Sequence, residues 1–295
     1  MIHNKLKHLI TSISPELSIR LQYLYYFRKR IRLDNPQTLD EKIQWMKLNL
    51  YGKDPIFTQC ADKYRVREYI KSCDCEELLN ELIAVHESPS QIDWNALPNK
   101  FVIKWNFGNG YNIICHDKKT LDIDKTIDQL ESWGKENAWL TNGEIQYKDI
   151  PKRIIIEKFI ETGTERVPDD YKIYCFHGKP LYMFVCVGRE KGTPKFYFFD
   201  KEWKLARINP DSINAPADFT LTKPPHLEEM FHYAAVLSQR FPFVRVDFYD
   251  TPQKVYFGEL TFTPSGGFDT HRLQETQQLF GDLLDLTTIP NLDFS

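Results

Sequence analysis

The sequence lacks the patterns that mark several common classes of protein. Its six cysteines include no CxxC pair, and the closest two, Cys73 and Cys75, are separated by one residue. This spacing fits neither a zinc motif nor a disulfide framework, so a reducing cytoplasm is the expected location. No run of about 18 apolar residues is present, which excludes a membrane-spanning helix. The first residues also lack the continuous apolar segment of a secretory signal.

Charge excess and the standard catalytic motifs are absent as well. A net charge of −3 leaves no global basic field, so nucleic acid is not an expected partner. Neither a P-loop nor a GxGxxG pattern occurs, no GxSxG elbow is found, and the histidines lack metal-ligand spacing. The usual phosphate-loop, dinucleotide-binding and serine-hydrolase sites are therefore excluded.

The composition describes a folded protein with more than one subdomain. The chain has 295 residues, of which 42% are hydrophobic and 27% are charged, so a sizeable buried core can form. A chain of this length predicts two or three subdomains that share a cleft. Helical patterns dominate to about residue 95, and strands and helices are mixed after it, which predicts an α+β fold.

Three local patterns define the mostly helical region. Thr38 and Glu41 have the spacing of a capping box, which predicts a helix that runs through Leu48. Residues 61–70 also have the pattern of a helix, and Leu82–Val85 that of a short strand.

Residues 1–34 differ from the rest of the chain in charge. Residues 17–27 can form an amphipathic helix within this segment. It either packs on the body with a solvated basic edge, or contacts a membrane surface or an anionic partner. Only Glu16 and Asp34 oppose the basic residues, which are Lys5, Lys7, Arg20, Arg28, Lys29, Arg30 and Arg32.

Lys104 is the first candidate ligand-binding residue. It ends the short β-rich run 101–104 and precedes a turn that contains Gly108, Asn109 and Gly110. A second strand, 112–115, completes a predicted hairpin. A lysine beside exposed backbone N–H groups suits the phosphates of a nucleotide, although a surface lysine before an ordinary turn has the same pattern.

Two further charged pairs lie at the ends of predicted strands. Glu157 and Lys158 follow the apolar run 154–156, which predicts either a cleft edge or exposed charges at a strand terminus. Asp170 and Lys172 share one strand face because side chains alternate along a strand. A cation there suits phosphate or a substrate anion, and the alternative is a weak surface ion pair.

The most informative residues lie on the last two predicted strands. Arg245 and Asp247 share one face of the first strand, and Glu259 and Thr261 share one face of the second. Adjacent antiparallel strands would bring Asp247 near Glu259, where two carboxylates need a cation or a shared proton. Their oxygens suit Mg²⁺ that bridges phosphates, and Arg245 suits charge on a transferring phosphoryl group. The alternative is a pair of solvated acids in an edge hairpin.

The order of these features resembles the ATP-grasp enzymes and, more narrowly, the TupA-like ATP-grasp family. That family is associated with the biosynthesis of bacterial teichuronopeptide, capsule and other surface polysaccharides. The resemblance covers roughly residues 35–285. It implies an ATP-grasp fold with a mostly helical region 1–95, a small lobe 96–156 and a large lobe 157–295, the two lobes enclosing a nucleotide cleft. The matching stretches are 40–47, 61–67, 101–114, 153–157, 170–179 and 257–264.

The resemblance also implies a role for each candidate residue. Thr261 departs from the family, which commonly has Asn two residues after the metal-binding Glu, so the second metal position is weakened. The implied ATP contacts are Lys104, Gly108, Asn109, Gly110, Glu157, Lys158, Phe159, Ile160 and Asp170. The implied Mg²⁺ ligands are Asp247, Glu259 and Thr261, and the implied catalytic residues are Lys172 and Arg245. The implied acceptor contacts are Ser265, Gly266, Gly267 and Arg272.

We therefore expect an ATP- and Mg²⁺-dependent ligase that joins a carboxylate to an amine through an acyl phosphate. A sugar phosphotransferase and a non-catalytic nucleotide-binding partner of a synthesis complex are alternatives. A glycosyltransferase is a further alternative. Its Asp-x-Asp candidate, Asp122 and Asp124, opens a predicted helix, whereas a sugar-nucleotide site would be expected between two strands. If the protein contacts a membrane surface or a glycosyltransferase, we expect the contact to be made by residues 1–34. The protein would then lie at the inner face of the membrane.

Overall fold

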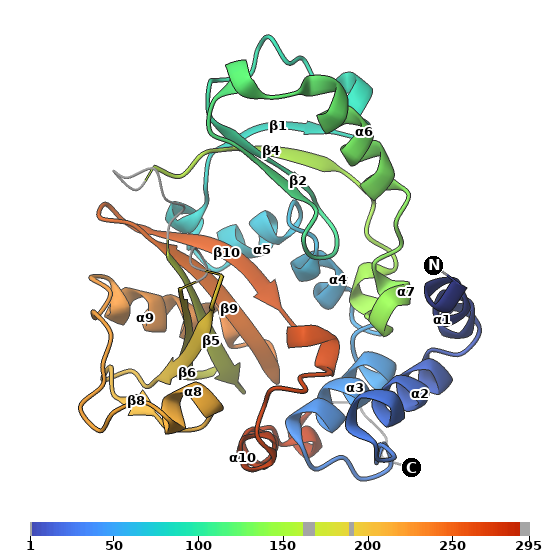
Figure 1. The fold of residues 1–295 in the computed structure, drawn as a ribbon, viewed down its shortest axis with the longest axis vertical. Coiled ribbons are helices and arrows are strands. Elements are labelled where there is room, and N and C mark those ends of the chain that lie inside the picture. Colours follow the sequence, from blue (N-terminus) through green and yellow to red (C-terminus); the bar gives the residue numbers. More distant parts are fainter. Residues whose placement is uncertain (1, 162–168, 189–191, 290–295) are drawn as a thin grey trace.

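The computed structural model describes residues 2–161, 169–188 and 192–289. It contains two antiparallel sheets, with helices around them (Figure 1). No helix in these described residues is long and apolar enough to cross a bilayer. The helices are α1 (Ile2–Ile13), α2 (Pro15–Phe27), α3 (Leu39–Asn49), α4 (Pro55–Ala61), α5 (Val66–Ser72), α6 (Ile123–Gly134), α7 (Trp139–Asn142), α8 (Pro210–Ile213), α9 (Leu227–Ser238) and α10 (Gln274–Leu283).

The smaller sheet has four strands in the order β1-β4-β2-β3. These are β1 (Leu82–His86), β2 (Phe101–Trp105), β3 (Asn112–Cys115) and β4 (Ile154–Lys158). The apolar run of β4 is buried because this strand pairs with β1 on one side and β2 on the other. The smaller sheet therefore does not coincide with the region 96–156, because β1 lies before residue 96 and β4 ends after residue 156.

The larger sheet has six strands in the order β10-β9-β5-β6-β7-β8. On β9, Val244, Val246 and Phe248 are fully buried, while Arg245 and Asp247 face the cavity described below, as the alternating pattern predicts. Helix α9 packs against β5, β6 and β9. The strands are β5 (Asp169–Phe176), β6 (Lys179–Val187), β7 (Lys195–Phe199), β8 (Leu205–Ala206), β9 (Phe243–Asp250) and β10 (Val255–Thr261).

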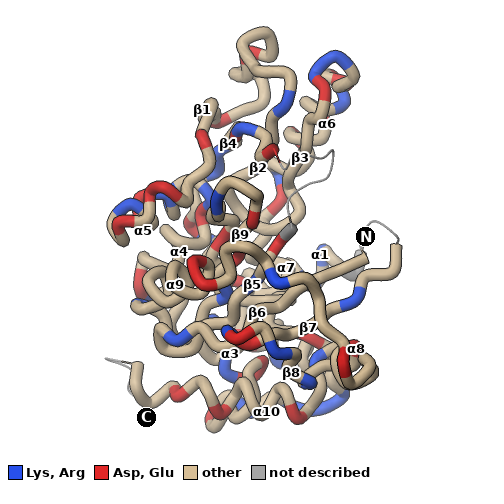
Figure 2. Tube along the Cα trace, turned by 90° about the vertical axis from the view of Figure 1, so that its left-hand side faces the viewer, with Lys and Arg blue, Asp and Glu red and all other residues tan. Residues whose placement is uncertain are grey.

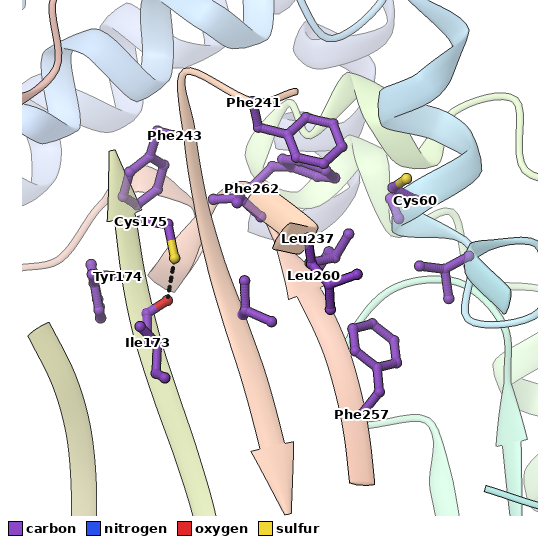
Figure 3. Packing of buried hydrophobic residues seen from close by; sticks show 14 of the residues in the cluster. Cys60, Ile173, Tyr174, Cys175, Leu237, Phe241, Phe243, Phe257, Leu260 and Phe262 are labelled. Carbon is purple, nitrogen blue, oxygen red and sulfur yellow. Dashed lines mark hydrogen bonds between the residues drawn. The ribbon is translucent and has the colours of Figure 1, made fainter. Parts of the chain in front are cut away.

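An aromatic core connects the N-terminal helices to the larger sheet. Phe241 and Phe262 lie with ring centroids 5.0 Å apart, close to Cys60 of α4 (Figure 3). Phe57 of α4 contacts both rings, at 5.5 and 5.0 Å. Each fully buried phenylalanine contributes about 1.5–3 kcal/mol of transfer free energy. These buried aromatic rings therefore fix α4 beside the end of β10.

The predicted helices of the N-terminal region are confirmed at one position and corrected at another. Thr38 caps α3 with the predicted capping box, in which Glu41 accepts from the backbone N–H of Thr38. The single helix expected over 61–70 is wrong, because α4 ends at Ala61 and α5 begins at Val66. Asp62 breaks it: its Oδ1 accepts from the backbone N–H groups of Tyr64 and Arg65, which turns the chain.

Candidate active site

A cavity of about 1090 Å³ lies between the two sheets. Side chains of β2 and β4 line it on one side, and side chains of β5, β9 and β10 line it on the other. Its volume is slightly above the range of about 300–1,000 Å³ found for ligand pockets. The cavity can therefore hold a nucleotide together with a second substrate.

Asp247 and Glu259 meet as the sequence predicts. They are directly opposed across β9 and β10, and Arg245 opposes Thr261 in the same register. Arg245 donates from Nε and Nη2 to the two carboxylate oxygens of Asp247, at 2.7 and 2.6 Å. Its Nη2 also lies 3.6 Å from Glu259 Oε1 and donates to the hydroxyl of Thr261 at 3.1 Å. One guanidinium therefore joins both acids in a single network.

The two carboxylates differ in their surroundings. Burial raises the pKa of Asp247, against the opposing effect of Arg245 and Lys172. Burial also acts to raise the pKa of Glu259, but Lys63 and Arg245 outweigh it and hold this pKa below its ordinary value. The Glu259 side chain is 32% exposed and that of Asp247 5%. Glu259 is thus an ionised carboxylate that a ligand can reach.

Lys104 and Glu157 bind each other in the cavity wall. The Nζ atom of Lys104 donates to Glu157 Oε2 at 2.8 Å, from the neighbouring strands β2 and β4. Burial acts to lower the pKa of Lys104, but Glu157 and Tyr249 outweigh it and raise this pKa, so the lysine is charged. Arg67 lies 3.5 Å from Glu157 Oε1 and lines the same wall.

Lys63 is a site residue that the sequence analysis missed. It lies in the break between α4 and α5, and its Nζ donates to the carbonyl of Gly108 in the β2–β3 turn. The same Nζ lies 3.8 Å from Glu259 Oε2 on the larger sheet. Burial, helped by Lys104, lowers its pKa against the opposing effect of Glu259. The predicted continuous helix hid this residue, although it falls in one of the stretches that carry the family resemblance.

The glycine-containing turn lies at the cavity as predicted. Asn109 and Gly110 line the cavity, and Gly108 accepts the bond from Lys63 through its carbonyl. Gly108 has φ +64°, and a Cβ there would lie 2.8 Å from the ring of Tyr111. Glycine is therefore required at this position by both conformation and space.

The three residues after Glu157 do not line the cavity, so their predicted contact with the adenine edge would be made through the backbone. The Nζ of Lys158 donates to Glu81 Oε2 at 2.9 Å, where both side chains are more than half exposed, so it points away from the cavity. Its backbone N–H donates to Glu81, and its carbonyl accepts from Asn80. Phe159 is buried and its ring packs on His116 at 5.1 Å. Ile160 is half-buried. The side chains of Lys158 and Phe159 are thus engaged outside the cavity.

Asp170 and Lys172 lie on one strand face, as predicted, and both line the cavity. Lys172 donates to the carboxylate of Asp170 and, at 3.1 Å, to Asp247 Oδ2. Burial acts to lower the pKa of Lys172, but Asp247 and Asp170 outweigh it and raise this pKa. The lysine is therefore charged, and it connects β5 to the Arg245–Asp247 network.

The predicted acceptor residues divide into two groups. Ser265 lines the cavity. Gly266 and Gly267 are buried, and their carbonyls accept from Gln44, with Lys47 also donating to Gly266. Arg272 touches the cavity but is only 3% exposed, because it donates to Asp40 and lies 2.9 Å from Asp269. Gly266, Gly267 and Arg272 thus have structural partners already.

The donor set fits a metal that arrives with a phosphorylated ligand. Asp247 and Glu259 supply two adjacent carboxylates, and the described residues contain no group of three or more His, Cys, Asp or Glu side chains placed to hold a metal. Mg²⁺ is commonly bound by one or two carboxylates together with phosphate oxygens and waters. The hydroxyl of Thr261 donates to Glu259 Oε1 at 2.8 Å and so orients this carboxylate.

The Asp-x-Asp candidate for a sugar-nucleotide site has a structural role. Asp122 is the N-cap of α6, and its Oδ1 accepts from the backbone N–H of Lys125 at 3.1 Å. The prediction that it opens a helix is confirmed. Asp122 therefore stabilises the start of α6, away from the cavity between the sheets.

Three solved structures of ligases, one of them described as an ATP-grasp ligase, are similar to the chain at low identity. D-alanine–D-alanine ligase from Bacillus anthracis complexed with ATP has 15% identity and a TM-score of 0.45, over 77% of this chain and 65% of that one. L-amino acid ligase from Bacillus licheniformis has 12% identity and a TM-score of 0.49, over 93% and 63%. The ligase PsnB, complexed with Mg, ADP and a phosphomimetic precursor variant, has 10% identity and a TM-score of 0.44, over 83% and 65%. The chain thus spans about two thirds of the length of these proteins.

Sequence comparison identifies the family. No functionally curated protein matches the chain. The model of the TupA-like ATP-grasp family matches residues 41–285, which is most of the chain. The observed α+β architecture, with two antiparallel sheets around one cavity, agrees with that match. The chain belongs to the TupA-like ATP-grasp family.

Proposed function

We propose that the protein is an ATP-dependent ligase that joins a carboxylate to an amine. One observation carries the proposal: Arg245 joins two directly opposed carboxylates in a cavity whose other wall presents Lys104. Anionic oxygens of a triphosphate need cations and backbone donors, and the transferring group needs charge stabilisation. In this proposal the small lobe bears Lys104, the large lobe bears Asp247, and the nucleotide lies between them.

The cations of the cavity would bind and orient the nucleotide. Lys104 and Lys63 approach it from the side of the small sheet, and the turn at Gly108–Gly110 offers backbone N–H groups. Lys172 and Arg245 approach it from the large sheet, where charge develops during phosphoryl transfer. Glu157 would accept from the adenine amino group. Asp247 and Glu259 would hold Mg²⁺, which neutralises phosphate charge when it is bound.

Two steps account for the reaction. An oxygen of the substrate carboxylate attacks the γ-phosphorus of ATP, so that the bond to the ADP oxygen breaks and an acyl phosphate forms. The amine then attacks the acyl carbon, phosphate leaves, and the amine gives up a proton. The products are an amide, ADP and phosphate. Closure of the Gly108–Gly110 turn over the phosphates would exclude water, which otherwise hydrolyses the acyl phosphate.

The family association indicates where the reaction would be used. We propose a cytoplasmic role in bacterial surface-polysaccharide biosynthesis, with a uronic acid or an amino acid as the carboxylate. Ser265 lies on the part of the cavity that would take this acceptor. The pair formed by Arg272 and Asp40 would shape the acceptor side without binding the acid directly, because both side chains are already paired.

The decisive assay measures ADP formation with a panel of uronic acids, amino acids and amines. The ligase account predicts ADP release that needs both a carboxylate and an amine, with free phosphate as a product. Arg245→Met should lower this release by about a thousandfold, and Lys158→Met, which alters a lysine outside the cavity, should leave it unchanged. Phosphate found on the product would instead establish a phosphotransferase. ATP turnover that needs neither substrate would contradict both readings.

A further inference from the structure

The helical hairpin of α1 and α2 exposes an unusual amount of apolar surface. Of the eleven exposed large hydrophobic side chains in the described part of the chain, eight lie between residues 6 and 26. Leu6, Leu9 and Ile13 follow one face of α1 at spacings of three and four residues. The eight are Leu6, Leu9, Ile13, Leu17, Leu21, Leu24, Tyr25 and Tyr26.

Polar side chains are buried where α1 meets α2. The hydroxyls of Thr11 and Ser18 lie 2.6 Å apart where the two helices meet, and both side chains are almost fully buried. Gln22 is also buried and donates to Ser18 at 3.1 Å. A helix pair in water ordinarily buries its leucines and exposes its hydroxyls. Although α2 also buries Ile19 and Tyr23, the hairpin buries hydroxyls and an amide while six of its leucine and isoleucine side chains are exposed, as expected if its outer face meets an apolar medium.

The charge of this segment is also distinct. Residues 1–34 contain seven Lys or Arg and two Asp or Glu, a net of +5, so the rest of this chain of net charge −3 carries −8. Glu16, one of the two acids, is paired with Arg20 at 2.8 Å. Elsewhere, α5 carries both signs (Figure 2), and α9 and α10 carry acidic residues without Lys or Arg. An anionic surface would therefore attract this segment and repel the remainder.

We propose that α1 and α2 form a docking face for a bilayer that contains anionic phospholipid. The leucines would enter the acyl boundary, while Lys5, Arg28, Lys29 and Arg30, all exposed, would meet the headgroups. Tyr25 and Tyr26 lie at the end of the apolar stripe beside these basic residues, as tyrosines do at membrane interfaces. The helices would lie in the plane of the surface, because neither is long enough to cross it.

The position of the hairpin supports this assignment. Helices α1 and α2 lie at the edge of the molecule opposite α9, with α1 packed on α2 and α7 (Figure 1). The hairpin lies away from the larger sheet, so docking through it leaves the cavity accessible. A lipid surface is favoured over a protein partner because the apolar stripes are flanked by basic residues with so few acids.

The test is flotation of the full chain with phosphatidylcholine vesicles, with and without phosphatidylglycerol. We expect binding at least about tenfold tighter with phosphatidylglycerol, weakened by added salt. The double variant Leu9→Glu/Leu21→Glu should lose binding, and Arg30→Gln should weaken it by about fivefold. The matched control is Ile213→Glu, which changes a side chain of similar exposure in α8, 51% against 56% for Leu9, and should bind as the wild type does.

Three outcomes would overturn the proposal. The first is failure of the wild type to float with either vesicle, and the second is an equal loss for Ile213→Glu. The third is a dimer that Leu9→Glu dissociates in a chain that does not bind vesicles, since the face would then belong to a second copy. The variants should keep wild-type ATP turnover, so this proposal can fail independently of the ligase activity.

Discussion

Two arginine–carboxylate clusters at the cavity look alike in composition and differ in accessibility. Arg245 contacts Asp247 and Glu259 on β9 and β10, and the Glu259 side chain is 32% exposed. Arg272 lies 2.9 Å from both Asp40 and Asp269, and the Asp40 side chain is 1% exposed. The first cluster thus presents the Glu259 carboxylate to the cavity. In the second, which we call the closed cluster, the Asp40 carboxylate is enclosed and, of the two acids, only Asp269, 21% exposed, reaches the cavity.

The closed cluster connects separate parts of the chain. Besides Arg272, the Asp40 carboxylate accepts from Gln277 of α10 and from the backbone N–H of Asp269. Burial raises the pKa of Asp40, with Arg272 as the main opposing influence. Every oxygen of this carboxylate has a protein partner, so its function is to hold α3 and α10 together. An arginine beside a carboxylate indicates ligand binding only where one oxygen stays accessible.

The largest expected effect on activity follows from the accessible cluster. Arg245→Met should lower ATP turnover by about a thousandfold, the lower end of what an arginine supplies in phosphoryl transfer. Steady-state kcat measures this, and Arg272→Met at matched concentration of folded protein is the control. Equal losses in both variants would show that the two clusters do not differ in function.

The closed cluster should affect stability instead. Arg272→Met leaves Asp40 as an unpaired buried charge, which costs about 3–5 kcal/mol of unfolding free energy. Urea unfolding measures the loss. The double variant Asp40→Leu/Arg272→Met removes both charges and should be more stable than the single variant. A single variant as stable as the wild type would contradict the assignment.

A smaller effect is expected for the missed lysine. Lys63→Met removes a cation from the cavity and should weaken ATP binding about ten- to a hundredfold, the range for a charge-assisted hydrogen bond. Calorimetric titration with ATP measures it. Lys158→Met is the matched control, since that lysine pairs with Glu81 outside the cavity. Weakened binding in the control would place Lys158 at the nucleotide after all.

The smallest expected effect is on the pH dependence of stability, and it concerns His177, which lies outside both clusters. Burial lowers the pKa of His177 below its ordinary 6.5, and its Nε2 accepts from the backbone N–H of Asp285. As the pH falls through 6.5, the unfolded chain takes up this proton first, so acid should destabilise the fold. His177→Asn, which tolerates the φ of 49° at this position, should flatten the pH dependence of the melting temperature. Identical pH profiles for both proteins would disprove the contribution.

The sequence predicts strands and their facing residues well where the pattern alternates. Asp247 opposite Glu259 follows from two alternating strands joined by a short turn, and the structure has this register. Lys63 was not predicted as a site residue because it lies in a four-residue break between two helices. The side chain of Asp62 causes this break, and helical periodicity does not reveal it. The pairing of Arg272 with Asp40 could not be predicted, because the two residues lie 232 positions apart in the chain. Such distant pairs are fixed by tertiary packing.

The most direct test of the account is calorimetric titration of the wild type and of Asp247→Asn/Glu259→Gln with ATP, in the presence and absence of Mg²⁺. The account predicts that Mg²⁺ strengthens ATP binding to the wild type, and that this gain disappears in the variant while Lys104 still supports metal-free binding. ATP binding that gains equally from Mg²⁺ in both proteins, or no ATP binding to the wild type, would contradict it.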